Sequence, residues 1–343
     1  LSESPVKAGV IYAGTDDGFI NITDNDGSSW KTIEVKKLPG VPATAYVNDI
    51  KADNFDVNKV YAVLDNHKYG DYQPYIYTSN DKGKTWRSIT SNLPDRTLTW
   101  RIVQDHVEKN LFFAATEYGI YFSVNSGKSW SKLNGGVPTI SFRDLAIHKR
   151  ENDLVGASFG RGFYVFDDIS VFRELSNSQM NNKATLFSVR KAWWYIARPY
   201  LGFNDPWNGH KGSQGDSYFV APNPPFGAVF TYHLSESLVS KKDMRTEKEK
   251  SSIKKGKAVG FPGWKIVESE RREREPQVII EVKDKNGDVV RRLEGPISKG
   301  FHRVAWDLRY PSPNSILEGA ASVNVSGFLA PPGEYTVTLY TKV

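Results

Sequence analysis

Short runs of apolar residues recur through the first half of the chain, and each is followed by a turn rich in glycine and aspartate. Apolar runs bounded by such turns are typical of β-strands. They occur at residues 10–14, 60–64, 111–115 and 154–157. A further strand is expected after each turn, at residues 19–23, 75–79, 120–123 and 163–166. An inner strand is expected ahead of the last three units, at residues 45–50, 98–103 and 141–147.

A turn motif with the pattern S/T-x-D/N-x-G-x-S/T-W occurs at residues 23–30, 79–86 and 123–130. We interpret it as the Asp-box hairpin turn, with a structural rather than a catalytic role. Its acidic or amide side chain is expected to bind backbone N–H groups one or two residues ahead. Its glycine is expected to adopt a positive φ, and its tryptophan to begin the next strand and bury a large apolar face. These residues are Asn25, Gly27 and Trp30, then Asp81, Gly83 and Trp86, then Asn125, Gly127 and Trp130.

The three motif tryptophans are spaced by 56 and then by 44 residues. Self-similarity with a period of about 40–50 residues indicates a propeller or a related repeat array, and four strands per unit is the composition of a propeller blade. The fourth unit has Asp167 and Asp168 in place of the motif, and residues 171–175 are its candidate last strand. In the first unit, residues 1–9 align with the strand ends of later units, so the chain is expected to start inside a blade.

The sequence therefore predicts an all-β fold in which residues 1–175 form about three and a half four-stranded blades of a partial Asp-box β-propeller. An incomplete ring leaves strand edges unpaired. The remaining blades are accordingly expected as partners, either on the N-terminal part of the same precursor or on a separate chain.

The second half of the chain has no such repeat. Residues 176–215 are predicted to be a linker packed on the propeller, with Trp193, Trp194 and Trp207 as anchors. Residues 216–343 are predicted to form an immunoglobulin-like β-sandwich with a charged helical insertion at residues 238–275. Its expected strands are residues 227–234, 277–283, 289–293, 300–308 and 335–340, and its expected helices are residues 238–255 and 264–275.

Composition excludes several kinds of chemistry. The chain has no cysteine, which removes thiol catalysis, disulfides and zinc–thiolate sites. Histidines are scattered without ligand spacing, at His106, His148, His210, His233 and His302, so neither a metal site nor a cofactor is expected. No apolar run is long enough for a transmembrane helix.

Positive charge is concentrated in one segment. Residues 241–257 carry eight Lys or Arg against three acidic residues, a local charge of +5 within a chain total of +6. The preferred interpretation is a solvated helix, and the alternative is binding to RNA or to an anionic lipid surface. A nucleic-acid partner is not expected.

Several sequence blocks resemble one protein family. They include T-W-R-I-V-Q-D-H at 99–106, S-F-G-R-G-F-Y-V-F-D-D at 158–168, N-P-P-F-G-A-V-F-T-Y at 223–232 and G-F-H-R-V-A-W-D-L-R-Y-P at 300–311. Together they resemble the C-terminal part of large bacterial sortilin-like proteins, also labelled bacterial-neuraminidase-repeat glycosyl hydrolases. The resemblance implies one or two Asp-box propellers followed by an immunoglobulin-like domain. It also implies a bacterial protein that is secreted, periplasmic or on the cell surface. The arginine triad of sialidases and the paired catalytic aspartates of xyloglucan-cleaving enzymes are not assembled in this sequence.

A candidate ligand face is expected at the end of the blades opposite the Asp boxes. It would carry Asp16, Asp17, Asn48, His67, Tyr69, Trp100, Arg101, Glu117, Tyr118, Arg143, Asp144 and Arg161. No catalytic residue is assigned. The preferred function is a binding or scaffold module for a protein, peptide or glycan. The alternative is a glycoside hydrolase whose site is completed by the missing blades, and which needs two carboxylates about 5–10 Å apart. A purely structural interpretation pairs Arg101 and Arg143 with Asp144 and Glu117.

Overall fold

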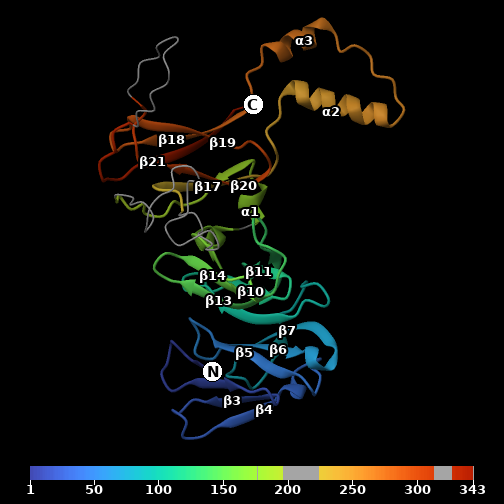
Figure 1. The fold of residues 1–343 in the computed structure, drawn as a ribbon, viewed down its shortest axis with the longest axis vertical. Coiled ribbons are helices and arrows are strands. Elements are labelled where there is room, and N and C mark those ends of the chain that lie inside the picture. The colour runs from blue at the N-terminus through green and yellow to red at the C-terminus, as the bar shows by residue number, and fades with distance from the viewer. Residues whose placement is uncertain (176, 196–223, 313–326, 343) are drawn as a thin grey trace, which may run out of the picture. The chain divides into compact units, whose positions relative to one another are not determined.

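The computed structural model describes residues 1–175, 177–195, 224–312 and 327–342. The chain divides into two compact units, Leu1–Leu175 and Ser176–Val343. Antiparallel sheets dominate both units, and helices are few (Figure 1). The helices that the structure describes include none that is both long and apolar enough to span a membrane.

The first unit consists of four antiparallel sheets that follow one another along the chain, and within each sheet the strands pair in sequence order. The first sheet contains β1 (Ser2–Glu3), β2 (Ile11–Gly14), β3 (Phe19–Thr23) and β4 (Lys31–Glu34). The second contains β5 (Tyr46–Ala52), β6 (Val60–Asn66), β7 (Asp71–Ser79) and β8 (Arg87–Ser88). The third contains β9 (Thr99–Gln104), β10 (Phe112–Thr116), β11 (Gly119–Ser123) and β12 (Ser131–Lys132), and the fourth contains β13 (Phe142–His148), β14 (Asp153–Ser158) and β15 (Phe163–Phe166).

These strands lie close to the predicted positions, with two differences. The predicted fourth strand at residues 171–175 is wrong, because Ile169–Glu174 forms a 3-10 helix, η3. Asp168 starts this helix: its backbone is left-handed, and its carboxylate accepts from the Ser170 amide at 3.2 Å. In the first sheet, β1 is a two-residue inner strand paired with β2. Two short 3-10 helices, η1 (Val35–Lys37) and η2 (His67–Tyr69), lie outside the sheets.

The three motif turns share one hydrogen-bond pattern. In the second sheet, Asp81 accepts from the Thr85 amide at 2.8 Å and from the Thr85 hydroxyl at 2.6 Å. The Ser79 hydroxyl accepts from the Gly83 amide at 2.8 Å. Asn25 and Asn125 accept in the same way from the amides four residues ahead, at 3.0 and 2.9 Å. The expectation of a bond one or two residues ahead was therefore wrong, since the side chain spans the whole turn.

A substitution at Asp81 tests this pattern. Asp81→Ala is expected to lower the free energy of unfolding by about 1–2 kcal/mol, because the turn loses a cap-like acceptor. Asp81→Asn is the matched control and should be nearly neutral, because asparagine makes the same bonds in the other two turns. Desolvation alone would raise the pKa of Asp81. Hydrogen bonds from Thr85 and Ser79 outweigh this effect and lower the pKa to about 2.

The stabilisation from Asp81 is thus present above its unfolded pKa of about 4 and is lost as the pH falls toward 2. Urea titrations at pH 7 and pH 3 measure both effects. Equal stability of Asp81→Ala and Asp81→Asn at pH 7 would contradict the assigned role.

The motif glycines and tryptophans join consecutive sheets. A Cβ on Gly83 would lie 2.2 Å from Ile22 Cδ1 of the first sheet, and one on Gly127 would lie 2.9 Å from Ile89 Cβ. Both glycines also have positive φ, so the position requires glycine for two reasons. Trp130 is 4% exposed, and its indole N–H donates to the Ile89 carbonyl at 2.9 Å. Trp86 is partly buried against a core that the first and second sheets share.

Trp30 does not follow the prediction that motif tryptophans are buried. It is 46% exposed. The nearest atoms to a Cβ on Gly27 belong to Trp30 itself, whereas Gly83 and Gly127 meet the preceding sheet. The physical reason is that, among the described residues, no sheet lies against the Trp30 indole as the end of the second sheet, at Ile89, lies against that of Trp130.

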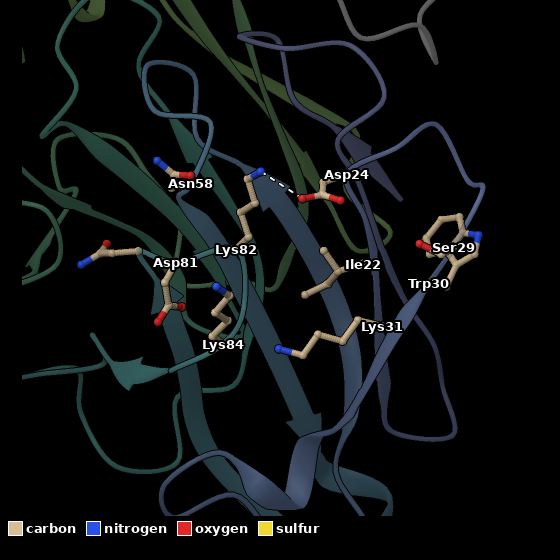
Figure 2. A pocket seen from close by; sticks show the side chains of 10 residues that line it. Ile22, Asp24, Ser29, Trp30, Lys31, Asn58, Asp81, Lys82 and Lys84 are labelled. Carbon is tan, nitrogen blue, oxygen red and sulfur yellow. Dashed lines mark hydrogen bonds and ion pairs between the residues drawn. The ribbon is translucent and has the colours of Figure 1, made fainter.

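The three motif turns define one end of the first unit, which we call the motif end. A hollow of about 510 Å³ lies there between the turns of the first and second sheets (Figure 2). The ammonium groups of Lys31 and Lys84 point toward this space. Its two carboxylates are engaged, Asp24 by Lys82 at 3.2 Å and Asp81 by its own turn. The hollow therefore offers the ammonium groups of Lys31 and Lys84 together with the side-chain amides of Asn58 and Asn80 and the apolar side chains of Ile22 and Trp30.

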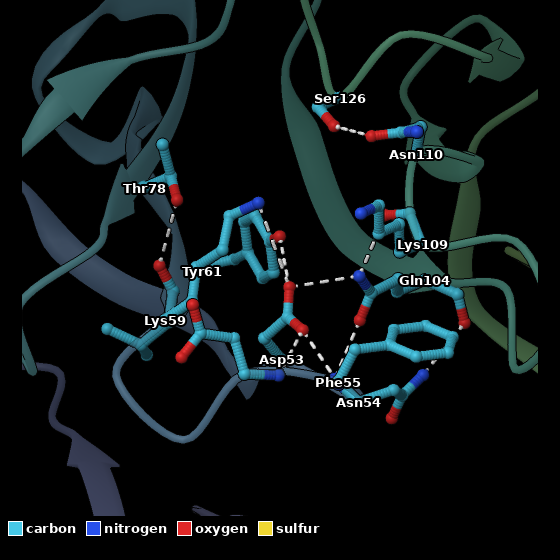
Figure 3. A network of polar contacts seen from close by, with 12 residues as sticks. Asp53, Asn54, Phe55, Lys59, Tyr61, Thr78, Gln104, Lys109, Asn110 and Ser126 are labelled. Atoms are coloured by element: carbon cyan, nitrogen blue, oxygen red, sulfur yellow. Dashed lines mark hydrogen bonds and ion pairs between the residues drawn. The ribbon is translucent and has the colours of Figure 1, made fainter.

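A buried polar network at the motif end holds the second and third sheets together (Figure 3). Asp53 accepts from the Tyr61 hydroxyl at 2.6 Å and from the Gln104 side chain at 2.9 Å. Its other oxygen accepts from the amides of Phe55 and Asp56 at 2.8 and 2.9 Å. Asp105 follows β9 of the third sheet as Asp53 follows β5 of the second, and it accepts from the Arg173 guanidinium instead. These two buried aspartates were not singled out from the sequence.

In its described residues, the second unit contains two three-stranded antiparallel sheets. One has the order β16 (Ala184–Leu186), β17 (Ala228–Leu234), β20 (Gly300–Trp306), and the other β19 (Val289–Gly295), β18 (Gln277–Lys283), β21 (Thr336–Lys342). Phe230 and Tyr232 of β17 share one buried core with Val278 and Ile280 of β18. The two sheets therefore pack through their apolar faces.

The segment predicted as a linker differs from expectation. It contains a short helix, α1 (Asn177–Asn181), and the strand β16, which pairs with β17. Trp193 and Trp194, expected as anchors, are half or more exposed. Trp207 and His210 lie outside the described residues. The helical insertion forms α2 (Lys241–Lys254) and α3 (Trp264–Arg271), and both helices are shorter than the predicted ranges 238–255 and 264–275.

Candidate functional site

The end of the first unit opposite the motif end gathers polar and aromatic side chains from three consecutive sheets. The inner strands β5, β9 and β13 start at this end, and the connections β6–β7, β10–β11 and β14–β15 close it. Because successive sheets repeat the same geometry, residues about 50 positions apart in the sequence become neighbours. We call this set of side chains the opposite-end cluster; it is built on Tyr46, Asn48, Trp100, Arg101 and Arg143.

Arg101 lies at the centre of this cluster. Its guanidinium donates to the Asn48 carbonyl at 2.7 Å and lies 3.3 Å from Asp49 and 3.5 Å from Asp144. The Asn48 side chain in turn donates to the Trp100 carbonyl at 3.2 Å. One arginine thus joins the second, third and fourth sheets.

Asp49 is the buried anchor of Arg101. Burial raises its pKa, while Lys51 and Arg101 oppose this effect. The carboxylate also accepts from the Ile102 amide at 3.2 Å. A side chain this buried has no access to a ligand, so its role is to hold Arg101 in position. Asp49 was not among the residues predicted for the face.

Arg143 and Trp100 form a stacked pair. The guanidinium carbon of Arg143 lies 3.6 Å from the centre of the Trp100 ring and 5.0 Å from that of Phe159. The Trp100 indole N–H donates to Glu117 at 3.1 Å, and Glu117 lies 4.0 Å from Arg143. Both ion pairs of the structural interpretation, Arg101 with Asp144 and Arg143 with Glu117, are therefore present. The stack leaves Arg143 and Phe159 exposed.

A second group of contacts to Trp100 comes from the second sheet and the connection that follows β6. The His67 ring packs edge-on against Trp100, with ring centres 5.7 Å apart. Buried Asp65 accepts from the Tyr46 hydroxyl at 2.6 Å and contacts His67 Nδ1 at 2.6 Å. Burial and this hydrogen bond raise the pKa of Tyr46, so its hydroxyl stays a donor. Tyr46 and Asp65 were also missed, because nothing in their local sequence separates them from ordinary strand residues.

Exposed aromatic side chains lie on the connections that close the same end of the sheets. Tyr69, Tyr118 and Phe159 occupy the equivalent connections of three consecutive sheets, and each is about half exposed or more. A surface with regularly placed rings and arginine side chains suits stacking and planar hydrogen bonding to a ligand.

The structure brings together only part of the predicted ligand face. Contacts link Asn48, Trp100, Arg101, Glu117, Arg143 and Asp144, together with His67. Tyr69, Tyr118 and Arg161 are exposed on their connections. Asp16 and Asp17 lie on the exposed β2–β3 turn, where the Thr15 hydroxyl donates to Asp17. In the described part of the chain, no group of three or more histidine or acidic side chains is placed to hold a metal ion.

Comparisons with known proteins give only distant similarity. No family model matches the sequence, and no curated protein matches it. One similar solved structure is YCF48 bound to D1 peptide, with 17% identity over 49% of this chain and 50% of the other, at a TM-score of 0.36. Another is the GH74 xyloglucanase of Xanthomonas campestris, with 14% identity over 55% of this chain and 31% of the other, at a TM-score of 0.38.

A third is PorZ, a surface component of the type-IX secretion system of Porphyromonas gingivalis. It has 12% identity over 96% of this chain and 35% of the other, at a TM-score of 0.34. The chain spans half or less of the length of these three proteins. At such identities and TM-scores, nothing about a ligand or an activity follows for this chain.

Proposed function

We propose that the first unit is a set of blades from an Asp-box β-propeller and that the second unit is an immunoglobulin-like domain. Three four-stranded antiparallel sheets with the same motif turn support the first assignment. Two antiparallel sheets around one apolar core support the second. The accompanying location, secreted, periplasmic or on the cell surface of a bacterium, rests on the sequence resemblance.

Further blades are proposed as the partner of the first sheet. The exposed indole of Trp30 has the position at which Trp130 is buried by the preceding sheet. An additional sheet with the same packing would cover it, whether that sheet belongs to the same polypeptide or to another chain.

We propose that the module binds an extended peptide, a protein segment or a glycan at the opposite-end cluster. The observation that carries this proposal is the Arg143–Trp100–Phe159 stack, flanked by Tyr69 and Tyr118 on equivalent connections. Such a surface offers flat apolar faces and a planar donor to a ligand.

The hydrolase alternative has less support in these residues. Asp49 and Asp65 are buried and hydrogen-bonded, while Glu117 and Asp144 are held by Trp100, Arg143 and Arg101. A glycosidase needs two carboxylates that face one scissile bond. These carboxylates instead hold side chains of the cluster: Asp49, Asp144 and Glu117 contact the arginines and Trp100, and Asp65 holds Tyr46.

A binding and turnover assay tests the proposal. The whole chain is applied to arrays of plant and bacterial oligosaccharides and of peptides, and hits are measured by calorimetry alongside the release of reducing ends. Binding without turnover is expected. The double variant Tyr118→Ala/Phe159→Ala should weaken binding about 10-fold or more, because two stacking faces are lost. Trp30→Ala, which removes an exposed aromatic at the motif end, is the control and should leave affinity unchanged.

Two results would contradict the proposal. Turnover of an oligosaccharide would favour the hydrolase. Binding that responds to Trp30→Ala and not to Tyr118→Ala/Phe159→Ala would place the ligand at the other end of the sheets.

A further inference from the structure

The helical insertion forms an arm whose base is fixed by ion pairs. The Arg245 guanidinium on α2 donates to both carboxylate oxygens of Glu270 on α3, at 2.6 and 2.8 Å. It also contacts Glu249 at 2.7 Å, and the Lys241 amide donates to Glu273 at 2.8 Å. Neither helix has a buried residue. The arm is therefore built without a core of its own, by charge pairing at its base.

Charge is distributed unevenly along this arm. All seven acidic residues of the insertion lie at residues 243–249 and 268–275. Residues 250–267, which end α2, connect the helices and begin α3, contain five lysines and no acidic residue. We call residues 250–267 the arm tip. These lysines are Lys250, Lys254, Lys255, Lys257 and Lys265.

The arm tip is also apolar and uncovered. Trp264 is 79% exposed, Phe261 65% and Ile253 62%. Phe261 and Trp264 pack edge to face, with ring centres 5.1 Å apart, so they present one aromatic wedge. Val259 and Ile266 are exposed beside them. Five large apolar side chains exposed to water within one short segment indicate an interaction surface.

We propose that the arm tip docks on an anionic lipid surface. Tryptophan and phenylalanine favour the boundary between headgroups and acyl chains, and lysines beside them are attracted to negative headgroups. The complete absence of acidic residues from the tip gives the charge complementarity that such a surface requires. RNA is a poorer fit, because Ile253, Val259 and Ile266 have no π-face on which a base stacks. The inference is independent of the ligand proposed for the first unit.

Vesicle co-sedimentation with the whole chain tests this proposal. Vesicles of phosphatidylcholine alone are compared with vesicles that also contain phosphatidylglycerol. Binding is expected only to the anionic vesicles and should weaken as salt is raised. Lys254→Gln/Lys255→Gln should weaken binding by about 5-fold per lysine. Phe261→Ala/Trp264→Ala should weaken it on the order of 100-fold, because two interfacial rings are lost.

The chain offers matched controls. Lys241→Gln/Lys242→Gln removes the same charge at the base of the arm and should have a smaller effect than the tip pair. Trp30→Ala removes an exposed tryptophan far from the tip in sequence and should have none. Near-native melting temperatures for all variants confirm that folding is intact, as expected for residues outside any core.

The proposal is overturned if the whole chain binds neither kind of vesicle, or if the tip variants bind like the base variants. It is also overturned if a single-stranded RNA oligonucleotide binds the tip more tightly than anionic vesicles do.

Discussion

Replacing Trp130 with alanine is expected to lower the free energy of unfolding by about 3–5 kcal/mol, the usual cost of removing a large buried aromatic side chain. Trp130 is 4% exposed and belongs to a core with Ile89 and Leu93, which follow the last strand of the second sheet, and with Phe112 of the third sheet. The substitution also leaves the Ile89 carbonyl without its indole donor. Urea denaturation followed by circular dichroism measures the change.

Trp30→Ala is the matched control, because the same residue occupies the same motif position but is 46% exposed. It should cost about 0.5 kcal/mol or less, as for a surface substitution. Similar losses of unfolding free energy for Trp130→Ala and Trp30→Ala would show that contact with the preceding sheet does not determine how much the motif tryptophan stabilises the chain. Trp86→Ala, which is partly buried, should fall between them.

Arg173→Met is expected to cost about 3–5 kcal/mol, because it leaves a buried carboxylate without its counter-charge. Asp105 is fully buried and accepts two bonds from the Arg173 guanidinium, both at 2.9 Å. Its other partners are the amides of Val107 and Glu108, at 3.0 and 2.7 Å. The double variant Asp105→Asn/Arg173→Met should recover part of the loss, because no unpaired charge then remains.

The pH dependence gives this pair a second signature. Burial alone would raise the pKa of Asp105, but Arg173 and the two amides bring it below its usual value. Its stabilisation is therefore present above the unfolded pKa of about 4 and is lost as the pH falls through the folded pKa. In Asp105→Asn this part of the acid destabilisation should disappear.

An exposed ion pair is the control for these experiments. Arg150 contacts Glu151 at 2.9 Å, and its side chain is 82% exposed. Arg150→Met should change stability by about 0–1 kcal/mol. If Arg150→Met and Arg173→Met lowered the free energy of unfolding equally, burial of Asp105 would not explain the effect of Arg173→Met.

Local sequence predicted most strands of the first unit, because each strand is an apolar run between turn residues and the motif turn recurs at a fixed place. The same local signals could not locate η3, where the left-handed backbone of Asp168 turns the chain into a 3-10 helix. They also could not show that Trp30 is exposed while Trp130 is buried. That difference depends on whether another sheet lies against the indole, which the motif itself does not encode.

The sequence predicted at which end of the sheets the residues of the candidate site lie. It did not predict all of the side chains that hold them in place. Counting strands placed Trp100, Arg101 and Arg143 at one end of the sheets, and the expected arginine ion pairs are present. Asp49 and Asp65 were missed, because a polar residue in a buried strand reveals its role only through partners on another strand. Arg101 is 52 residues from Asp49, and Tyr46 is 19 residues from Asp65.

The contacts made by the motif glycines and tryptophans have a consequence for cooperativity. They join the second sheet to the first, through Gly83 on Ile22, and the third to the second, through Trp130 on Ile89. In such a linear series, stability is the sum of each sheet's own contribution and that of its interfaces. Weakening the interface at Trp130 should therefore uncouple the second sheet from the third, and we expect two unfolding transitions in Trp130→Ala where the native first unit is expected to show one.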